Sequence, residues 1–222
     1  GDASASISSI KPPVCVSPLP NLEVTTSALS RDEKTQHYLI NERKLRVDVV
    51  NQFKLGVAEK YFSRPEGNHK ALVIPYLVKG KQVYAKFRTL PPTEKGFTNS
   101  GGSIEWMYNQ DAIRNDQNEL VICEAELDAL SLISAGYESV VALPGATTQK
   151  APWLSLLDEA KIKKIVLCFD NDKAGQEGAK KLANRIGLDK CYNLVLQGVK
   201  DLNEFFIQGQ TLEDFIALKD QS

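Results

Sequence analysis

The sequence predicts an α/β protein in which a parallel sheet flanked by helices follows a smaller α+β subdomain with a β-hairpin. From residue 120 onward, short apolar runs alternate with segments of helical period, which is typical of β-α-β units. Residues 165–169 are apolar and rich in β-branched side chains, as expected of a strand buried on both faces. Upstream, residues 72–77 and 82–89 resemble the two strands of a hairpin, joined by a turn at residues 79–81.

The first part of the chain shows little regular periodicity. Residues 1–29 are rich in Ser, Pro and Thr, which predicts a disordered tail or linker. A capping box at residues 30–33 predicts a helix that runs to about Glu42. A second short helix is expected at about residues 47–53, before Gly56. Together with the hairpin, these segments form a predicted N-terminal α+β subdomain over residues 30–118.

The second predicted domain covers residues 119–209 and alternates strands with helices. Its expected strands are 120–123, 139–143, 165–169 and about 192–196, and its expected helices are 127–134, 152–159 and 173–186. Gly136 and Gly187 are placed to end two of these helices. Residues 210–222 are expected to form a C-terminal helix.

Composition indicates an ordinary soluble protein. The 222 residues are 42% hydrophobic, yet no apolar run approaches the roughly 20 residues that cross a bilayer. The N-terminus lacks the regions of a signal peptide, so we expect an intracellular, cytoplasmic protein of bacterial or phage origin, with a mitochondrial location left open. The four cysteines, Cys15, Cys123, Cys168 and Cys191, are widely spaced and are expected to be buried thiols, not ligands of zinc or partners in disulfides.

Charge is divided unevenly along the chain. Residues 31–116 contain 15 Lys and Arg against 10 Asp and Glu, whereas residues 119–222 contain 11 against 16. A basic half beside an acidic half fits a protein that holds polyanions with one part and metal ions with the other. A chance distribution of surface charge is the alternative.

Acidic residues follow successive strands of the predicted parallel sheet. Asp170 and Asp172 come directly after residues 165–169, and Glu124 follows residues 120–123. Parallel strands end at one edge of the sheet, so these carboxylates are expected to lie together, near Asp128, one helical turn after Glu124, and Asp201, after the last strand. Each acid alone could be a helix N-cap. Their joint occurrence predicts a site for Mg²⁺ or Mn²⁺.

Basic residues gather near the predicted hairpin. Lys86 and Arg88 project from its second strand on the face opposite the apolar side chains, and Lys95 lies in the glycine-containing loop that follows. Cations that project together from a strand beside such a loop are able to grip phosphates. The solvated polar face of an edge strand would give the same pattern, so both interpretations stay open.

Four motifs resemble, in order and spacing, the Toprim domain that primases, topoisomerases and certain nucleases share. They lie at residues 120–130, 142–146, 169–175 and 200–204, and they include the glutamate motif at Glu124 and an Asp-x-Asp motif at residues 170–172. Upstream, residues 84–88 and 95–97 are similar to the phage primase-helicase and mitochondrial Twinkle branch, in which basic residues of this segment face the nucleotide.

The resemblance implies the RNA polymerase domain of a primase or primase-helicase. Such a domain joins ribonucleoside triphosphates on a single-stranded DNA template, with a replicative helicase acting in the same chain or as a separate partner. The resemblance implies catalytic and metal-binding roles for Glu124, Asp170 and Asp172, with metal-binding support from Asp201 and Asp128. It implies nucleotide or DNA binding by Lys86, Arg88, Lys95, Lys200 and Asn203.

Two departures from the family pattern keep other functions open. Ala125 stands where the family usually has glycine after the motif glutamate, and no zinc-binding cysteine cluster precedes residue 30. The same metals would also serve a Toprim nuclease that hydrolyses phosphodiesters. A third possibility is a non-catalytic, DNA-binding Toprim module of a Twinkle-like helicase. A ring helicase attached downstream would impose hexamers, whereas the fragment alone is expected to be a monomer.

Overall fold

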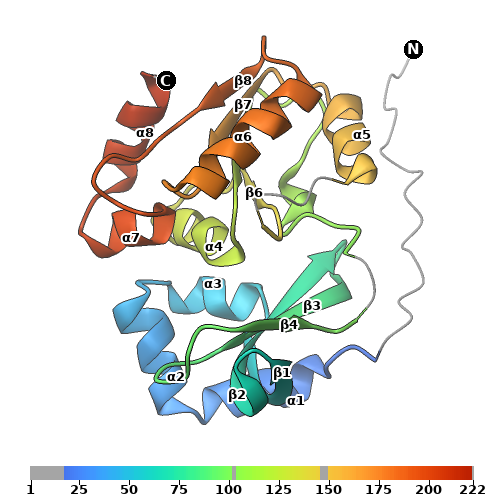
Figure 1. The fold of residues 1–222 in the computed structure, drawn as a ribbon, viewed down its shortest axis with the longest axis vertical. Helices are drawn as coiled ribbons and strands as arrows, with labels where there is room; N and C mark the ends of the chain where they lie inside the picture. The colour runs from blue at the N-terminus through green and yellow to red at the C-terminus, as the bar shows by residue number, and fades with distance from the viewer. Residues whose placement is uncertain (1–17, 102–103, 146–149, 222) are drawn as a thin grey trace.

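The computed structural model describes residues 18–101, 104–145 and 150–221, and two sheets organise them. The antiparallel sheet has the order β1-β2-β3-β4 and the parallel sheet has the order β6-β5-β7-β8. The antiparallel strands are β1 (Gly56–Ser63), β2 (Glu66–Val78), β3 (Lys81–Thr89) and β4 (Phe97–Asn99). The parallel strands are β5 (Glu119–Cys123), β6 (Val140–Ala142), β7 (Lys164–Cys168) and β8 (Cys191–Asn193). Figure 1 shows them as two stacked halves, which confirms the predicted fold class.

The prediction of a disordered tail over residues 1–29 is wrong for residues 22–29, because they belong to helix α1 (Leu22–Ser30). The Asn21 side chain caps this helix by accepting a hydrogen bond from the Val24 backbone N–H. Thr26 bonds back to a helix carbonyl, and Leu29 is buried in the core. Ser and Thr are weak helix formers, so the composition of this segment did not predict a helix. Tertiary packing of the helix stabilises it instead. The rest of the predicted tail, residues 1–17, lies outside the described residues.

The predicted capping box at residues 30–33 is wrong, because Ser30 ends α1. Asp32 instead caps the next helix, α2 (Glu33–His37), by accepting hydrogen bonds from the backbone N–H and the hydroxyl of Thr35. A π-helical turn over Tyr38–Glu42 continues α2 to the predicted end. Helix α3 (Val47–Gln52) follows within a residue of its predicted bounds.

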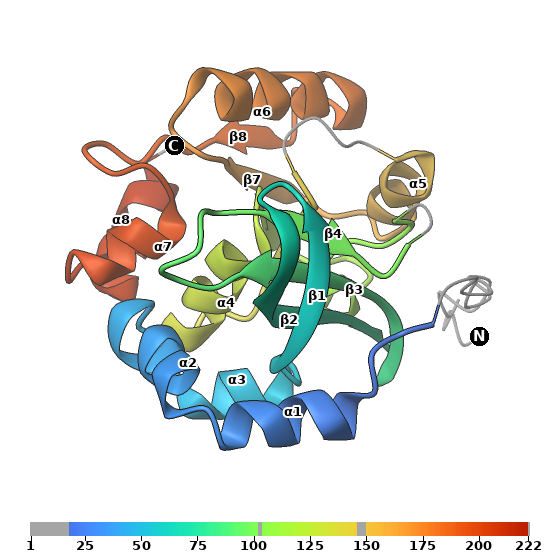
Figure 2. The same ribbon diagram turned by 60° about the horizontal axis from the view of Figure 1, so that its bottom comes forward.

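The hairpin forms as predicted but is longer, and the strand before it was not predicted. In β1, charged Glu59 and Lys60 stand next to each other, so the alternation of apolar and polar residues is weak. β1 pairs antiparallel with β2 along its whole length, and β4 pairs with β3 on the other side. Figure 2 shows β1 and β2 in front of the long strand β3.

Helices cover both faces of the parallel sheet. One face packs against α4 (Glu126–Ala135), α7 (Leu202–Ile207) and α8 (Leu212–Asp220), and the other packs against α5 (Ala151–Glu159) and α6 (Lys173–Ile186). The predicted helices of this half are confirmed, and α8 lies within the expected C-terminal helix. Two details differ from the prediction: β8 ends at Asn193 instead of continuing to Leu196, and α7 was not expected.

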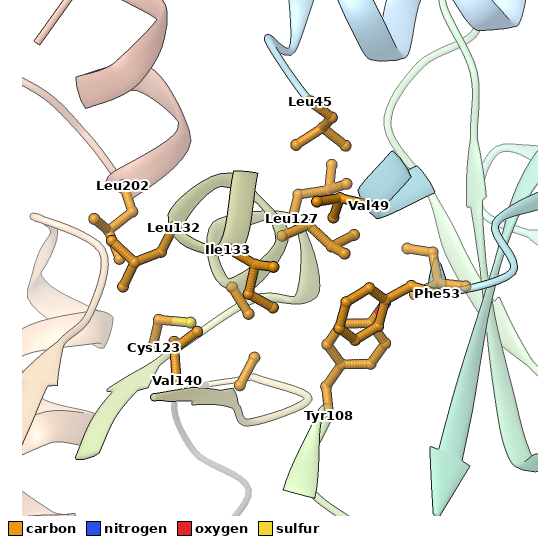
Figure 3. Close-up of a cluster of buried hydrophobic side chains, with 14 of the residues drawn as sticks. Leu45, Val49, Phe53, Tyr108, Cys123, Leu127, Leu132, Ile133, Val140 and Leu202 are labelled. Atoms are coloured by element: carbon orange, nitrogen blue, oxygen red, sulfur yellow. The ribbon is translucent and has the colours of Figure 1, made fainter. Parts of the chain in front are cut away.

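An apolar core joins the two halves. Figure 3 shows Leu45 and Val49, from the N-terminal half, pointing toward Leu127 of α4. Below them, the rings of Phe53 and Tyr108 are tilted against each other with centroids 5.6 Å apart. These side chains bury apolar surface between the halves, and this burial places the antiparallel sheet beside the carboxyl edge of the parallel sheet.

The predicted burial of the cysteines is confirmed for two of the three that the structure describes. Cys123 and Cys168 are buried, Cys191 is partly buried, and none of the three forms a disulfide; Cys15 lies outside the described residues. Within the described part of the chain, none of the helices has both the length and the apolar composition that crossing a bilayer requires.

Candidate functional site

A cavity of about 210 Å³ lies where the N-terminal half meets the carboxyl edge of the parallel sheet. Its two walls carry opposite charges. The cations come from Arg43, Arg88, Lys95 and Lys200, and the carboxylates from Glu126, Asp128, Asp170 and Asp201. Phe97, Ile74, Ala125, Leu127 and Asn203 complete the lining. The fold therefore brings together residues from six separate segments of the chain.

Asp170 is held at the end of β7 by a tight turn into α6. A Cβ atom on Gly175 would lie 2.3 Å from the backbone oxygen of Asp170, so only glycine allows this approach. The Gln176 side chain also donates a hydrogen bond to that oxygen. Asp172 caps α6 by accepting a hydrogen bond from the Gly175 N–H, and it lies exposed outside the cavity lining. The turn thus fixes both acids of the Asp-x-Asp motif.

Asp128 and Asp201 bring two further carboxylates to the cavity. Asp128 is 5% exposed and accepts a hydrogen bond from the Asn203 backbone N–H. Asp201 caps α7 by accepting a hydrogen bond from the Glu204 N–H. Burial raises the pKa of Asp128 well above its usual range, and the charges of Asp201 and Asp170 raise it further. Burial likewise raises the pKa of Asp170, although the nearby Lys200 ammonium opposes the shift.

Glu124 follows β5 and is partly buried outside the cavity lining. Its charge contributes to the raised pKa of Asp128, which places the two carboxylates within electrostatic reach. Across residues 18–101, 104–145 and 150–221, no three Asp, Glu, His or Cys side chains converge closely enough to hold a metal ion by themselves. The metal-binding roles of these acids therefore stay predictions.

Arg88 lies in the basic wall and projects from β3 into the cavity. Its Nε atom is buried and has no hydrogen-bond partner among the described residues. Burial lowers the pKa of the Arg88 guanidinium, and the negative charges of Asp128 and Asp201 oppose this shift. Among the described residues, no carboxylate forms an ion pair with Arg88. Because β3 runs between β2 and β4, the interpretation as a solvated edge strand is wrong.

Lys95 and Lys200 complete the basic wall near the acids. Partial desolvation lowers the pKa of Lys95, and the charges of Arg88 and Lys200 lower it further. The Lys200 Nζ atom lies 3.4 Å from an Asp170 carboxylate oxygen. Mutual repulsion among these cations would fall if an anion such as a phosphate entered between them.

Lys86 takes a place that the sequence did not reveal. Its Nζ atom lies 3.0 Å from both carboxylate oxygens of Glu126, which is 2% exposed on the first turn of α4. The Tyr76 hydroxyl donates a further hydrogen bond to Glu126. The predicted contact of Lys86 with a phosphate stays a prediction, since this ammonium already has a buried partner. No local pattern marks Glu126 or Tyr76, because each acquires its role through contacts between the two halves.

Asn203 is buried, and both the nitrogen and the oxygen of its side-chain amide form hydrogen bonds. Its Nδ2 atom donates to the Arg43 backbone oxygen and to the Ser131 hydroxyl, and its Oδ1 atom accepts from an Arg43 guanidinium N–H at 2.7 Å. Arg43 also lies over the Tyr38 ring. Asn203 therefore holds Arg43 at the cavity, and its predicted binding of nucleotide stays a prediction. Arg43 was not predicted as a site residue, because no motif singles it out.

Most of the acidic half, residues 119–222, matches a known protein family. A family model described as Toprim-like matches residues 121–206. These residues form a Toprim-like domain. The match confirms the resemblance on which the sequence interpretation rested, and it contains the Glu124, Asp170 and Asp201 motifs together with the turn at Gly175.

Several of the curated relatives are DNA primases. The chain is 32% identical over 99 residues to the DNA primase of Campylobacter jejuni, an alignment that covers 43% of this chain and 16% of that protein. The chain spans less than half the length of the curated relatives it matches.

Solved structures of primases share the fold of both halves. The Aquifex aeolicus primase, with its zinc-binding and RNA polymerase domains, has a TM-score of 0.73 and 20% identity over 90% of this chain and 59% of that chain. The primase fragment of the bacteriophage T7 primase-helicase has a TM-score of 0.64 and 21% identity over 81% of this chain and 72% of that chain. At such identities the likeness shows the fold, which extends beyond the Toprim-like domain into the antiparallel half.

The Toprim-like domain accommodates Ala125 without backbone strain. Ala125 precedes α4 with φ −130° and ψ 153°, an extended conformation that any residue adopts. The substitution from the usual glycine therefore adds a methyl group to the cavity lining and leaves the path of the backbone unchanged.

Proposed function

We propose that this chain is the part of a DNA primase that synthesises RNA primers on a single-stranded DNA template. The observation that carries the proposal is the two-sided cavity, in which the Arg88 guanidinium faces the carboxylates of a Toprim-like domain. The Nε atom of this guanidinium is buried and has no hydrogen-bond partner among the described residues. In the proposed division of labour, the basic subdomain at residues 30–118 binds nucleotide and template. The domain at residues 119–209 supplies the acids.

The donor set fits Mg²⁺ or Mn²⁺. The acids offer only oxygen ligands, and burial and mutual repulsion raise the pKa of Asp128 and Asp170, so a divalent cation would relieve an unfavourable charge cluster. The proposed ligands are Glu124, Asp170 and Asp172, with support from Asp201 and Asp128. Mg²⁺ commonly binds through one or two carboxylates together with substrate phosphates and water, which fits acids that do not close a cage by themselves.

The basic wall would orient the nucleotide. Arg88 and Lys95, which both line the cavity, would hold the phosphates, and Asn203 holds Arg43 beside them by a hydrogen bond. Synthesis requires the 3′ hydroxyl of one nucleotide to attack the α-phosphate of the next, with pyrophosphate leaving. Lys200, which lies beside Asp170, would neutralise charge on the leaving group. When bound, the metal ion would lower the pKa of the attacking hydroxyl and stabilise charge on the phosphoryl group.

Fixing the phosphates and excluding water would bring the reacting groups together at little further entropic cost. The likeness to the primase fragment of the T7 primase-helicase supports a replicative helicase as partner, in the same chain or separately. We expect the protein to act inside the cell, where template and nucleotides meet.

Primer synthesis tests this proposal directly. Labelled ribonucleoside triphosphates and single-stranded DNA of mixed sequence are incubated with the protein and Mg²⁺ or Mn²⁺, and products are separated by length. The wild type should make short RNA, and Glu124→Gln and Asp170→Asn should each lower the rate at least 100-fold, since charge stabilisation is a large share of catalysis. Asp189→Asn is the matched control, because Asp189 lies exposed before β8, at the opposite edge of the sheet.

Two outcomes would overturn the assignment. Shortening of labelled DNA without added nucleotides would indicate a Toprim nuclease. DNA binding that persists without metal, with no RNA product from any template, would indicate a non-catalytic module.

A further inference from the structure

Phe97 is a large apolar side chain left exposed at a strongly charged site. It is the first residue of β4, it lines the cavity, and 46% of it remains exposed. Most other cavity-lining side chains are charged or polar, so this ring gains little from burial in the protein. An exposed aromatic ring inside a polar cavity indicates a ligand surface more than it indicates a core position.

Three cations surround this ring. The Lys86 Nζ atom lies 4.8 Å from the ring centroid and the Lys95 Nζ atom 5.3 Å from it. Arg88 is the direct partner of Phe97 in the pairing of β3 with β4. Lys86 is fixed by its two contacts with Glu126, so it stays against the ring whether or not a ligand is present. Lys95 has no ion pair of this kind in the described part of the chain.

An aromatic ring flanked by cations suits a ligand with a flat base and a phosphate chain. Stacking against an aromatic side chain accepts any base, because every base has a π-face, and neighbouring cations hold the phosphates. The nucleotide phosphates would draw Lys95 away from the ring, which opens more of the ring to the base. The charge and the aromatic surface are therefore complementary parts of one site.

We propose that Phe97 stacks on a nucleobase while Arg88 and Lys95 hold the phosphates of the same nucleotide. The base belongs either to a ribonucleoside triphosphate or to the single-stranded template, and both present the same flat surface. This inference rests on the proposed function insofar as it requires a nucleotide in the cavity. It adds a base-binding residue to a site otherwise built from charges.

Tyr192 provides a matched control on the same molecule. It is 38% exposed on β8, and the Lys164 Nζ atom lies 4.9 Å from its ring centroid. It thus shares exposure and a lysine contact with Phe97, but it does not line the cavity. If an exposed aromatic ring with a lysine were sufficient for stacking, Tyr192 would bind bases equally well.

The test uses the fluorescence of 2-aminopurine, which falls when the base stacks. Wild-type protein is titrated, in EDTA so that no reaction occurs, with 2-aminopurine ribonucleoside triphosphate and separately with a single-stranded oligonucleotide carrying one 2-aminopurine. Quenching by the first, the second or both identifies the source of the base. Phe97→Ala and Phe97→Leu should abolish the quenching and weaken binding about tenfold, the size typical of one stacked base. Phe97→Tyr should retain both, and Tyr192→Ala should behave as wild type.

The Leu variant separates stacking from packing, because it keeps apolar volume and loses the π-surface. Circular dichroism and thermal unfolding of each variant confirm that the fold is intact. Equal quenching by wild type and Phe97→Leu would overturn the inference and leave the proposed function standing. Wild-type protein that binds neither probe would overturn the inference, and the primer-synthesis assay with Mg²⁺ would still decide the proposed function. Phe97-dependent quenching by a protein that makes no primer would retain the base site and reject priming.

Discussion

The Lys86 ammonium lies 3.0 Å from both carboxylate oxygens of Glu126, and this buried pair connects the basic sheet to the Toprim-like domain. The Lys86 and Glu126 side chains are only 16% and 3% exposed. Burial, together with the negative charge of Glu126, raises the pKa of the tyrosine side chains around this carboxylate. Burial raises the pKa of Tyr84 to about 12, and Glu126 contributes to that shift. The pair therefore fixes β3, and with it Arg88, relative to the acids.

Removal of one member of this pair should be far more costly than removal of both. In Lys86→Met, the Glu126 carboxylate is left buried with only the Tyr76 hydroxyl, which should lower the free energy of unfolding by about 3 kcal/mol. The double variant Lys86→Met/Glu126→Gln leaves no buried charge and should recover most of this loss. Urea unfolding of the two single variants and the double variant gives the coupling energy. Additive losses would show that the pair contributes nothing as a unit.

Arg88 should lower the stability of the ligand-free protein and raise its affinity for single-stranded DNA. Since its guanidinium is buried with an unpartnered Nε atom, Arg88→Met should leave the ligand-free protein as stable as wild type or more stable. The same variant should weaken binding of single-stranded DNA and lower the slope of log affinity against log salt by about 0.7. Fluorescence anisotropy at several salt concentrations measures both quantities. Lys181→Ala, an exposed cation on α6, is the control and should change neither.

The local sequence pattern predicted most of the strands and helices of the parallel-sheet half. The elements that it did not predict depend on contacts between residues far apart in the chain. The strand at residues 165–169 and helix α6 were predictable because apolar periodicity is strong there and Asp172 and Gly187 mark the helix ends. Strand β1 was missed because it forms only through pairing with β2, and its own residues alternate weakly.

The same distinction applies to the candidate site. The acids follow strand ends, so topology alone predicted that they share one edge. The contact between Arg43 and Asn203 spans 160 positions in the chain, and the contact between Lys86 and Glu126 spans 40. Neither contact has a local signal. The roles of Arg43 and Glu126 depend on contacts between the two halves, so they could not be predicted from the residues next to them in the chain.

The turn between β7 and α6 should tolerate no side chain at Gly175. In Gly175→Ala, the new Cβ atom would lie 2.3 Å from the Asp170 backbone oxygen, so the turn must open and Asp170 must move. We expect a loss of about 2 kcal/mol in the free energy of unfolding and a larger proportional loss of Mg²⁺ affinity. Thermal unfolding with increasing Mg²⁺ measures both effects. A variant that keeps wild-type Mg²⁺ affinity would show that the placement of Asp170 is not critical for the metal.

Asp128 should make the stability of the metal-free protein fall as pH rises. Its pKa is raised in the folded state, chiefly by burial, so between the ordinary value of 3.8 and the raised value the folded chain binds more protons than the unfolded chain. Stability is therefore lost across that window as pH increases. Asp128→Asn keeps an acceptor for the Asn203 N–H and carries no charge.

This variant should match wild type in stability below pH 3.8 and should be more stable than wild type at neutral pH. Mg²⁺ should narrow the difference, because a cation beside the acids stabilises the ionised wild type more than the variant. Urea unfolding from pH 3 to pH 8, with and without Mg²⁺, measures this dependence. If wild type and variant changed in parallel over the whole range, burial of Asp128 would not be the source of the unfavourable charge, and relief of that charge could not account for metal binding at this edge.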